Sequence, residues 1–336
     1  MLEAILSFLP RAIAQGTPLL YGSTGEIITQ KSGNMNLGIP GVMYVGGICG
    51  VIGAFLYEQS LPAPSAINPV LAVLIPTLFC LMGSLLMGLL FCFLTVTLRA
   101  NQNVTGLAMT TFGVGFGNFF GGSLVKLSGA DMPFLALSAT SNCFKKTLPF
   151  ADKMGVFGEL VLGYSFLVYL AVAVALVSAY VINRTRTGLH LRSVGENPGT
   201  ADAVGINVTK YKYLATCIGS GISGLGGFYC IIDYMASQEA YLSLEAFGWL
   251  SIALVIFALW RPHMTIIGST VFGFLFSCSS YIANIEGITV TMAAKPLLKM
   301  LPYLVTILVL IAISLRKKRE NQPPASLGLP YFREER

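Results

Sequence analysis

Long apolar stretches dominate the pattern of positions along the chain. Nine stretches are apolar over about the length that an α-helix needs to cross the hydrocarbon core of a bilayer. They cover residues 5–28, 38–55, 69–98, 104–121, 160–182, 213–232, 246–260, 265–283 and 296–315. We therefore expect an all-α fold, a polytopic transmembrane helical bundle of about nine spans, with about eight to ten as the range.

Two of these stretches depart from a simple span. Residues 69–98 form a longer stretch than a bilayer requires, so we expect this helix to tilt or kink, with Pro76 as the kink site. The first stretch is interrupted by proline and polar residues, namely Pro10, Arg11, Gln15 and Pro18. Its beginning is therefore expected in the membrane interface.

One long polar and basic segment, residues 184–212, interrupts the second half of the chain. Within it Asn197 suits a helix N-cap, Pro198 the first helical position and Gly205 the left-handed position just past a helix end. The intervening residues make about two turns of helix, which is marginal alone in water. We expect this short helix to dock on a cytosolic protein, and the alternative is a plain connector between spans.

Lysine and arginine positions predict the orientation of the spans. With segment 184–212 in the cytosol, 14 of the 21 Lys and Arg residues lie on that side and 7 on the other, as the positive-inside rule favours. The C-terminus is then cytosolic. The chain, 1–336, is expected to be one transmembrane domain with an outer loop at 122–159 and a cytosolic tail at 316–336.

Composition and motifs exclude several other classes of protein. Hydrophobic residues make up 54% of the chain and charged residues 11%, so no soluble domain is expected. The net charge of +6 is scattered through short loops, which disfavours a nucleic-acid partner. The 7 cysteines show no disulfide framework or metal-ligand spacing, and the sequence lacks a catalytic motif and a Walker A loop. We expect no enzyme activity, cofactor or metal, and any ATP must be hydrolysed by another protein.

Small residues recur at spacings of four in two of the predicted spans. Such spacing lets helix backbones approach closely in lipid, and we expect helix packing at these positions. The residues are Gly113, Gly117 and Gly121 in one span, and Gly219, Ser223 and Gly227 in another. The second set overlaps a match to the dinucleotide-binding fingerprint, which we discard because no strand precedes it.

Four blocks of sequence together resemble one family of transport proteins. The most specific block, residues 188–208, contains Gly-Glu-Asn-Pro at 195–198 and Ala-Asp-Ala-Val-Gly at 201–205. It resembles the coupling region of ABC importer permeases of the nucleoside and simple-sugar group, related to ribose and branched-chain amino-acid permeases. Three further blocks agree, at residues 32–43, at 248–253 with 260–262, and at 324–331. The resemblance covers essentially the whole chain.

The resemblance implies a permease subunit of an ATP-driven importer in a bacterial cytoplasmic (inner) membrane. Its implied partners are a cytosolic ABC ATPase, a second homologous permease and an extracytoplasmic substrate-binding protein. By this analogy the residues that couple to the ATPase are Glu196, Asn197, Pro198, Ala201, Asp202, Val204 and Gly205. The chain departs from the family pattern at Gln30 and Pro40, where acids are expected, and at Ala246 and Ala258, where glycines are expected.

The transported solute is expected to be small and neutral. Ionisable residues in or near the spans lie close to span ends, where we expect water to reach them, and this disfavours an ion-driven secondary transporter. They are Glu26, Asp233, Glu239, Glu245 and Lys299. Neutral polar and aromatic residues are candidates to line the path of a nucleoside, namely Asn118, Tyr234, Trp249, Tyr281 and Asn284. A simple sugar or riboflavin remains an alternative solute, and ordinary packing an alternative role for each residue.

Overall fold

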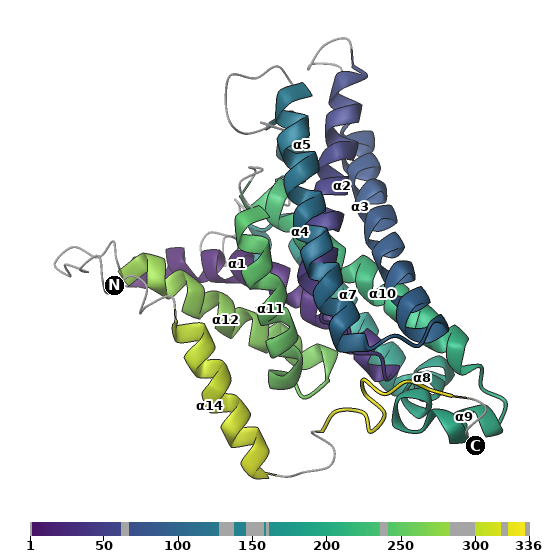
Figure 1. Cartoon of the computed structure of the whole chain (residues 1–336). Helices are drawn as coiled ribbons and strands as arrows, with labels where there is room; N and C mark the ends of the chain where they lie inside the picture. Colours follow the sequence, from purple (N-terminus) through teal and green to yellow (C-terminus); the bar gives the residue numbers. More distant parts are fainter. Residues whose placement is uncertain are drawn as a thin grey trace.

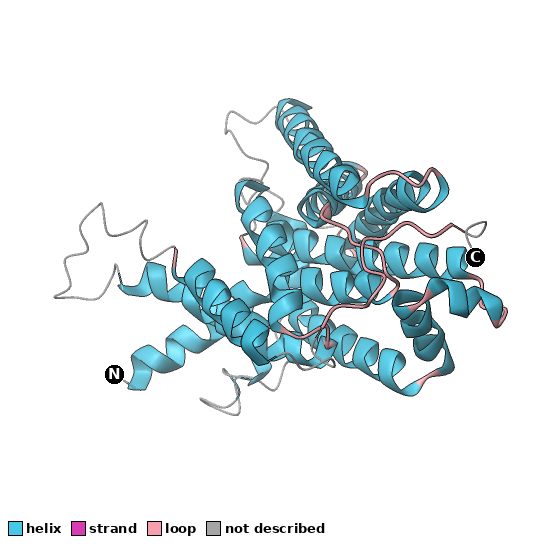
Figure 2. Cartoon of the chain, turned by 60° about the horizontal axis from the view of Figure 1, so that its bottom comes forward, coloured by secondary structure: helices cyan, strands magenta, loops and turns pink. Residues whose placement is uncertain are grey.

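The computed structural model describes residues 2–61, 67–127, 138–145, 158, 161–235, 241–282, 300–316 and 322–332. Within these ranges the regular secondary structure is helical and no strand occurs (Figure 2). The all-α prediction is therefore confirmed for the part of the chain that the structure describes.

Each predicted span overlaps a helix (Figure 1). The helices are α1 (Leu2–Lys31), α2 (Ile39–Gln59), α3 (Pro69–Cys92), α4 (Gln102–Leu127), α5 (Ser138–Phe144), α7 (Phe166–Arg184), α8 (Arg186–Glu196), α9 (Pro198–Ala203), α10 (Val208–Tyr229), α11 (Tyr241–Phe257), α12 (Pro262–Ile282) and α14 (Leu301–Arg316). Short π-helical stretches continue α3 through Phe93–Thr97 and α10 through Cys230–Tyr234.

Among the residues that the structure describes, four helices are long and apolar enough to cross a membrane. They are Ile39–Gln59, Pro69–Thr97, Phe166–Arg184 and Val208–Tyr234, and α11 contains a shorter apolar helix, Leu244–Phe257. Crossing by the remaining helices, and with it the total of about nine spans, stays a prediction.

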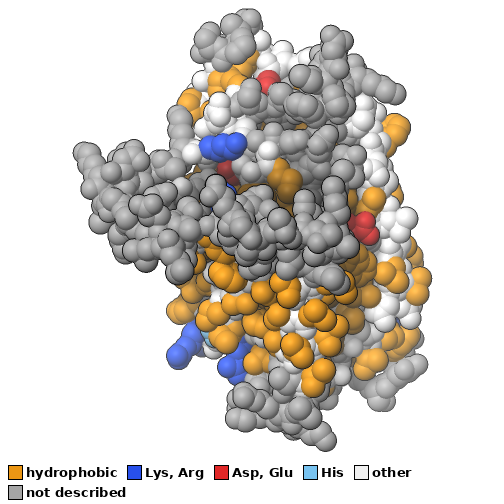
Figure 3. All heavy atoms as spheres, turned by 90° about the vertical axis from the view of Figure 1, so that its left-hand side faces the viewer, with side chains coloured by type: hydrophobic (Ala, Val, Ile, Leu, Met, Phe, Trp, Pro, Cys, Tyr) orange, Lys and Arg blue, Asp and Glu red, His pale blue; other side chains and the backbone are white. Residues whose placement is uncertain are grey.

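The exposed surface of several helices is apolar. Along α3 the side chains of Leu74, Leu78 and Leu86 are half or more exposed, whereas the small residues Gly83 and Ser84 are buried. Helices α12 and α14 also expose apolar side chains, and Figure 3, a view of the side that is on the left in Figure 1, shows a broad hydrophobic area. A continuous exposed apolar surface of this kind is suited to contact with lipid.

Helix α10 packs between α1 and α2 through its small residues. Gly219 and Ser223 face Gly25 of α1, and Gly227 lies directly against the backbone of Met43 in α2. At each of the two glycines an added Cβ would overlap atoms of the neighbouring helix. The absence of side chains there is therefore what allows the three helices to approach so closely.

Helix α4 contacts α2 in the same way. An added Cβ at Gly113 would overlap the backbone of Gly41, and one at Gly117 would meet the ring of Tyr44. Gly121 is buried on the same helix. Both glycine series identified in the sequence therefore lie on buried helix faces.

Two ionisable residues expected near water are buried, which corrects that prediction. Glu26 is fully buried, and its Oε1 accepts hydrogen bonds from Gln30 Nε2 at 2.8 Å and from the backbone N–H of Asn36 at 3.2 Å. Asp233 is 7% exposed and accepts a short hydrogen bond from the Ser165 hydroxyl. The turn after α1 covers the carboxyl group of Glu26, and a residue distant in the sequence, Ser165, covers that of Asp233. The hydrophobic pattern around each residue does not reveal such contacts.

The other three ionisable residues have different outcomes. Glu245 is exposed, as expected, whereas Glu239 and Lys299 lie outside the described residues.

We expect Gly227→Val to lower the free energy of unfolding by about 1–3 kcal/mol, because the new side chain must push α10 away from Met43. The matched control is Gly115→Val on α4, where an added Cβ meets nothing within 4 Å; its effect should stay within about 0.5 kcal/mol. The measurement is equilibrium unfolding in mixed detergent micelles. Equal unfolding free energies for the two variants would contradict the close packing described here.

Candidate functional site

Cations that are far apart in the sequence gather at one end of the molecule. A cavity of about 430 Å³ has Lys31, Arg192 and Arg261 in its wall. A second cavity, of about 870 Å³, has Arg99, Lys210 and Lys212 in its wall. All six are among the 14 Lys and Arg residues that the sequence pattern assigned to the cytosolic face.

Helix α9 lies at this end and begins with a side-chain cap. The Oδ1 of Asn197 accepts a hydrogen bond from the backbone N–H of Thr200 at 3.0 Å, and Pro198 occupies the first turn. The cap satisfies one of the amide groups that a helix start leaves without a partner. The predicted N-terminus of the short helix is therefore present.

The end of α9 is closed by two backbone hydrogen bonds. Gly205 N–H donates to the carbonyl of Asp202, and Ile206 N–H to that of Ala201, both at 3.0 Å. This pair of bonds is a Schellman motif, which needs a left-handed residue, and Gly205 has a φ of +85°. Both ends of α9 are thus defined by its own sequence.

Helix α9 has one buried face and one free face. Ala201 is 2% exposed and packs with Val194 and Val208, which attaches α9 to α8 and α10. On the other face Ala203 is exposed and Val204 is 71% exposed. Of the residues expected to couple to an ATPase, Val204 therefore offers a contact surface, whereas Ala201 holds the helix in place.

The C-terminal segment 322–332 binds alongside α8 and α9, as the yellow trace in Figure 1 shows. Backbone hydrogen bonds of 3.0 Å run from Ser326 N–H to the carbonyl of Gly195 and from Gly328 N–H to that of Gly33. The hydroxyl of Tyr331 donates to Oδ2 of Asp202 at 2.8 Å. The tail thereby connects α9 with the turn between α1 and α2.

Glu196, at the end of α8, stands beside this tail. Its Oε2 accepts from the backbone N–H of Ala325 at 3.4 Å. Burial lowers the pKa of the Lys31 ammonium, and the nearby Glu196 carboxylate opposes that shift. Glu196 therefore helps to hold the tail and a half-buried cation of α1 in place.

The turn between α11 and α12 reaches the same region. The indole N–H of Trp260 donates to Oε1 of Gln30 at 2.6 Å, and Gln30 donates in turn to Glu26. A glutamine can do both because its amide carries a donor and an acceptor. The sequence blocks at 32–43, 188–208, 260–262 and 324–331 thus meet at one end of the fold.

A third cavity, of about 660 Å³, lies elsewhere in the structure. Its size is within the range of small-molecule sites. Its wall includes aromatic and neutral polar side chains, namely Phe8, Gln15, Tyr164, Tyr234 and Ser277, together with Arg11. The Ser277 hydroxyl donates to Gln15 Oε1 at 2.7 Å, and the ring of Tyr234 stacks on that of Tyr229 with centroids 6.4 Å apart.

Of the predicted path residues, Tyr234 lines this cavity. Asn118 is exposed on α4 and Trp249 is half-buried in α11, and neither is among the described residues that line the cavity. The side chain of Tyr281 and all of Asn284 lie outside the described residues.

The sequence reasoning missed Gln15, Tyr164 and Ser277 as cavity residues. Gln15 interrupts the first apolar stretch, and that interruption was the one signal that could have identified it. Among the described residues, no group of three or more His, Cys, Asp or Glu is placed to hold a metal ion.

The sequence matches one protein family and several known proteins over most of its length. Residues 9–312 match the family described as branched-chain amino acid transport system / permease component. The guanosine ABC transporter permease protein of Bacillus subtilis is 26% identical over 347 aligned residues, covering 99% of this chain and 98% of the relative.

Two further relatives align over shorter ranges. The nucleoside ABC transporter permease protein of Lactococcus lactis is 28% identical over 295 residues, 88% of each chain. A protein of Haloferax volcanii provisionally named a glucose ABC transporter permease is 28% identical over 270 residues, 80% of this chain and 75% of the relative. The family match spans most of the sequence, so the chain belongs to the family of permease components of the branched-chain amino acid transport system.

Proposed function

We propose that the chain is the membrane-spanning permease subunit of an ATP-driven ABC importer that carries a nucleoside. The observation that carries this proposal is the capped helix α9, whose buried face is attached to α8 and α10 and whose free face presents Val204. Two relatives that align with most of the chain are named nucleoside or guanosine permeases, which supports the choice of solute. The family consists of permeases, so this subunit forms the path and does no chemistry.

The proposed partner of α9 is a separate cytosolic ABC ATPase. A groove on that ATPase would receive the free face of α9, with Val204 as the apolar contact and Ala203 beside it. This places segment 184–212 and the C-terminus in the cytosol, in agreement with the cations gathered at this end.

Two further partners are proposed, because one permease subunit forms only half of the translocation path. A second homologous permease, in a heterodimer, would complete the route through the bacterial cytoplasmic membrane. An extracytoplasmic binding protein would deliver the solute to the opposite end of the pair.

The cavity around Tyr234 is the proposed contact site for the solute. A nucleoside is neutral and has a flat base with a hydroxylated sugar, so it needs stacking surfaces and hydrogen-bonding groups. Tyr164 and Tyr234 provide aromatic rings, and Gln15 and Ser277 provide polar groups. A single cation, Arg11, lines the described part of the cavity.

The second candidate solute is a simple sugar, favoured by the glucose-named relative. A sugar would use the same polar groups but would gain less from two tyrosine rings. The test measures ATP hydrolysis by the reconstituted complex with guanosine, glucose or riboflavin added. The solute that stimulates hydrolysis is identified as the substrate. If none of the three stimulates ATP hydrolysis, the proposal that the solute is a nucleoside or a simple sugar is wrong.

We expect Val204→Asp to reduce solute-stimulated ATP hydrolysis by about tenfold or more, because a carboxylate would enter an apolar contact with the ATPase. Since Val204 is 71% exposed, the melting temperature of the isolated permease should not change. The matched variant Val204→Ile keeps the apolar contact and should keep the activity. Full stimulation in Val204→Asp would contradict docking through this face.

We expect Tyr234→Ala to raise the KM for guanosine uptake by about tenfold, because a stacking partner of the base is lost. Tyr180→Ala serves as the control, since Tyr180 is 64% exposed on α7, away from the cavity. The measurement is uptake by proteoliposomes that contain the complete transporter. If both variants have the KM of the wild type, the cavity around Tyr234 is not the contact site.

A further inference from the structure

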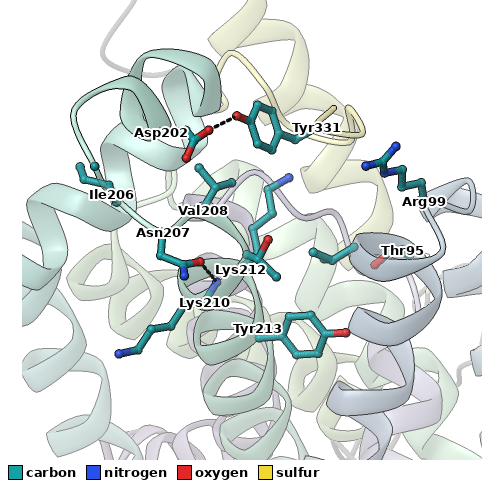
Figure 4. Close-up of a pocket in the computed structure, with 13 residues that line it drawn as sticks. Thr95, Arg99, Asp202, Ile206, Asn207, Val208, Lys210, Lys212, Tyr213 and Tyr331 are labelled. Carbon is teal, nitrogen blue, oxygen red and sulfur yellow. Dashed lines mark hydrogen bonds between the residues drawn. The ribbon is translucent and has the colours of Figure 1, made fainter. Parts of the chain in front are cut away.

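The cavity of about 870 Å³ beside α9 has no role in the proposed solute path (Figure 4). Its wall is formed by the end of α3, the turn after α9, the start of α10 and Tyr331 of the tail. Three cations line its described part: Arg99 follows α3, and Lys210 and Lys212 belong to the first turns of α10. It lies among the cations of the proposed cytosolic end and shares no lining residue with the cavity around Tyr234.

Lys212 is a buried residue whose ammonium faces the cavity and has no partner for its charge among the described residues. The residue is 3% exposed, and Figure 4 shows its ammonium directed past Val208 into the space below Tyr331. Among the described residues, no hydrogen bond or ion pair to this ammonium is found, and α3 places the neutral Thr95 opposite it. A buried ammonium is costly unless something of opposite charge compensates it. The cavity in front of it provides room for such a group.

The charges around the cavity favour an anion. Asp202 is the one carboxylate that lines its described part, and Oδ2 of this residue already accepts the hydroxyl of Tyr331. Among the described residues that line the cavity, three cations therefore face a single carboxylate. The start of the 22-residue helix α10, capped by Asn207 Oδ1 on the N–H of Lys210, adds the partial positive charge of a helix N-terminus.

We propose that this cavity binds a phosphate group. Arg99 offers a planar guanidinium that can bond two phosphate oxygens at once, and Lys210 and Lys212 act as point charges. The phosphate neutralises the unpaired ammonium of Lys212 and contacts the turn that ends α9. This binding site is separate from the proposed solute path and does not depend on it.

Two sources can supply the phosphate, a lipid head group or a free phosphate compound. A lipid head group is favoured by exposed apolar side chains on the two elements that supply Arg99 and Tyr213 to the cavity wall. Leu98 of the α3 end is 58% exposed, and Leu214 and Ile218 of α10 are 49% and 52% exposed. The hydroxyls of Thr97 and Tyr213, 2.5 Å apart, join α3 and α10 there. Acyl chains on this surface would place the head group of an anionic phospholipid at the cavity.

The test is the melting temperature of the purified full chain in a neutral detergent. Four additions are compared: dioctanoyl phosphatidylglycerol, dioctanoylglycerol without phosphate, sodium phosphate, and sodium chloride at equal ionic strength. A ligand that binds the folded state raises the melting temperature. If the source is a lipid, we expect a higher melting temperature with dioctanoyl phosphatidylglycerol than with dioctanoylglycerol. If free phosphate also binds, we expect a higher melting temperature with sodium phosphate than with sodium chloride.

Lys212→Met should weaken the binding of the stabilising probe at least tenfold, while leaving the protein without probe as stable as the wild type or more so. Arg186→Met is the control, because Arg186 is an exposed cation of α8 outside the cavity. If Lys212→Met does not fold, the same measurement is made on Arg99→Met, because Arg99 is exposed. This variant should also weaken the binding of the stabilising probe. The proposal is overturned if neither phosphate-bearing probe exceeds its control, or if the cavity variants keep the full rise.

Discussion

The close approach of α10 to α1 and α2 is the contact on which the rest of the structure depends. It exists because Gly219 and Gly227 have no side chain where the neighbouring backbones pass. In lipid there is no hydrophobic force between helices, so packing at short range must hold them together. Helix α9 ends only a few residues before α10 begins, so whatever fixes α10 also fixes the position of α9.

Around that core, segments distant in sequence assemble one composite surface. The tail ties Gly195 and Gly33 by backbone hydrogen bonds, and Trp260 reaches Gln30. A force applied to the free face of α9 would therefore act on the ends of α1, α10 and the α11–α12 turn together. This is a physical reason why a helix as short as α9 would suit the proposed coupling to an ATPase, because its contacts would pass the force to several helices.

The features predictable from the sequence were local ones. Asn197 and Gly205 define α9 because a cap and a left-handed glycine act within a few residues, and apolar stretches predict helices for the same reason. The burial of Glu26 and the cavity around Tyr234 were not predictable, since each depends on which distant segment covers the residue. Span crossing is intermediate, because α4 is a helix of 26 residues but is not among the described helices that are apolar enough to cross a membrane by length and composition.

The central claim is that the free face of α9 is held by a separate ATPase. The most direct measurement is photo-crosslinking in the reconstituted complex, with the crosslinking amino acid in place of Val204 in one sample and of the buried Ala201 in another. The account predicts an adduct with the ATPase subunit from position 204 and none from position 201. Adducts from position 204 with lipid alone, or with no other subunit, would contradict it.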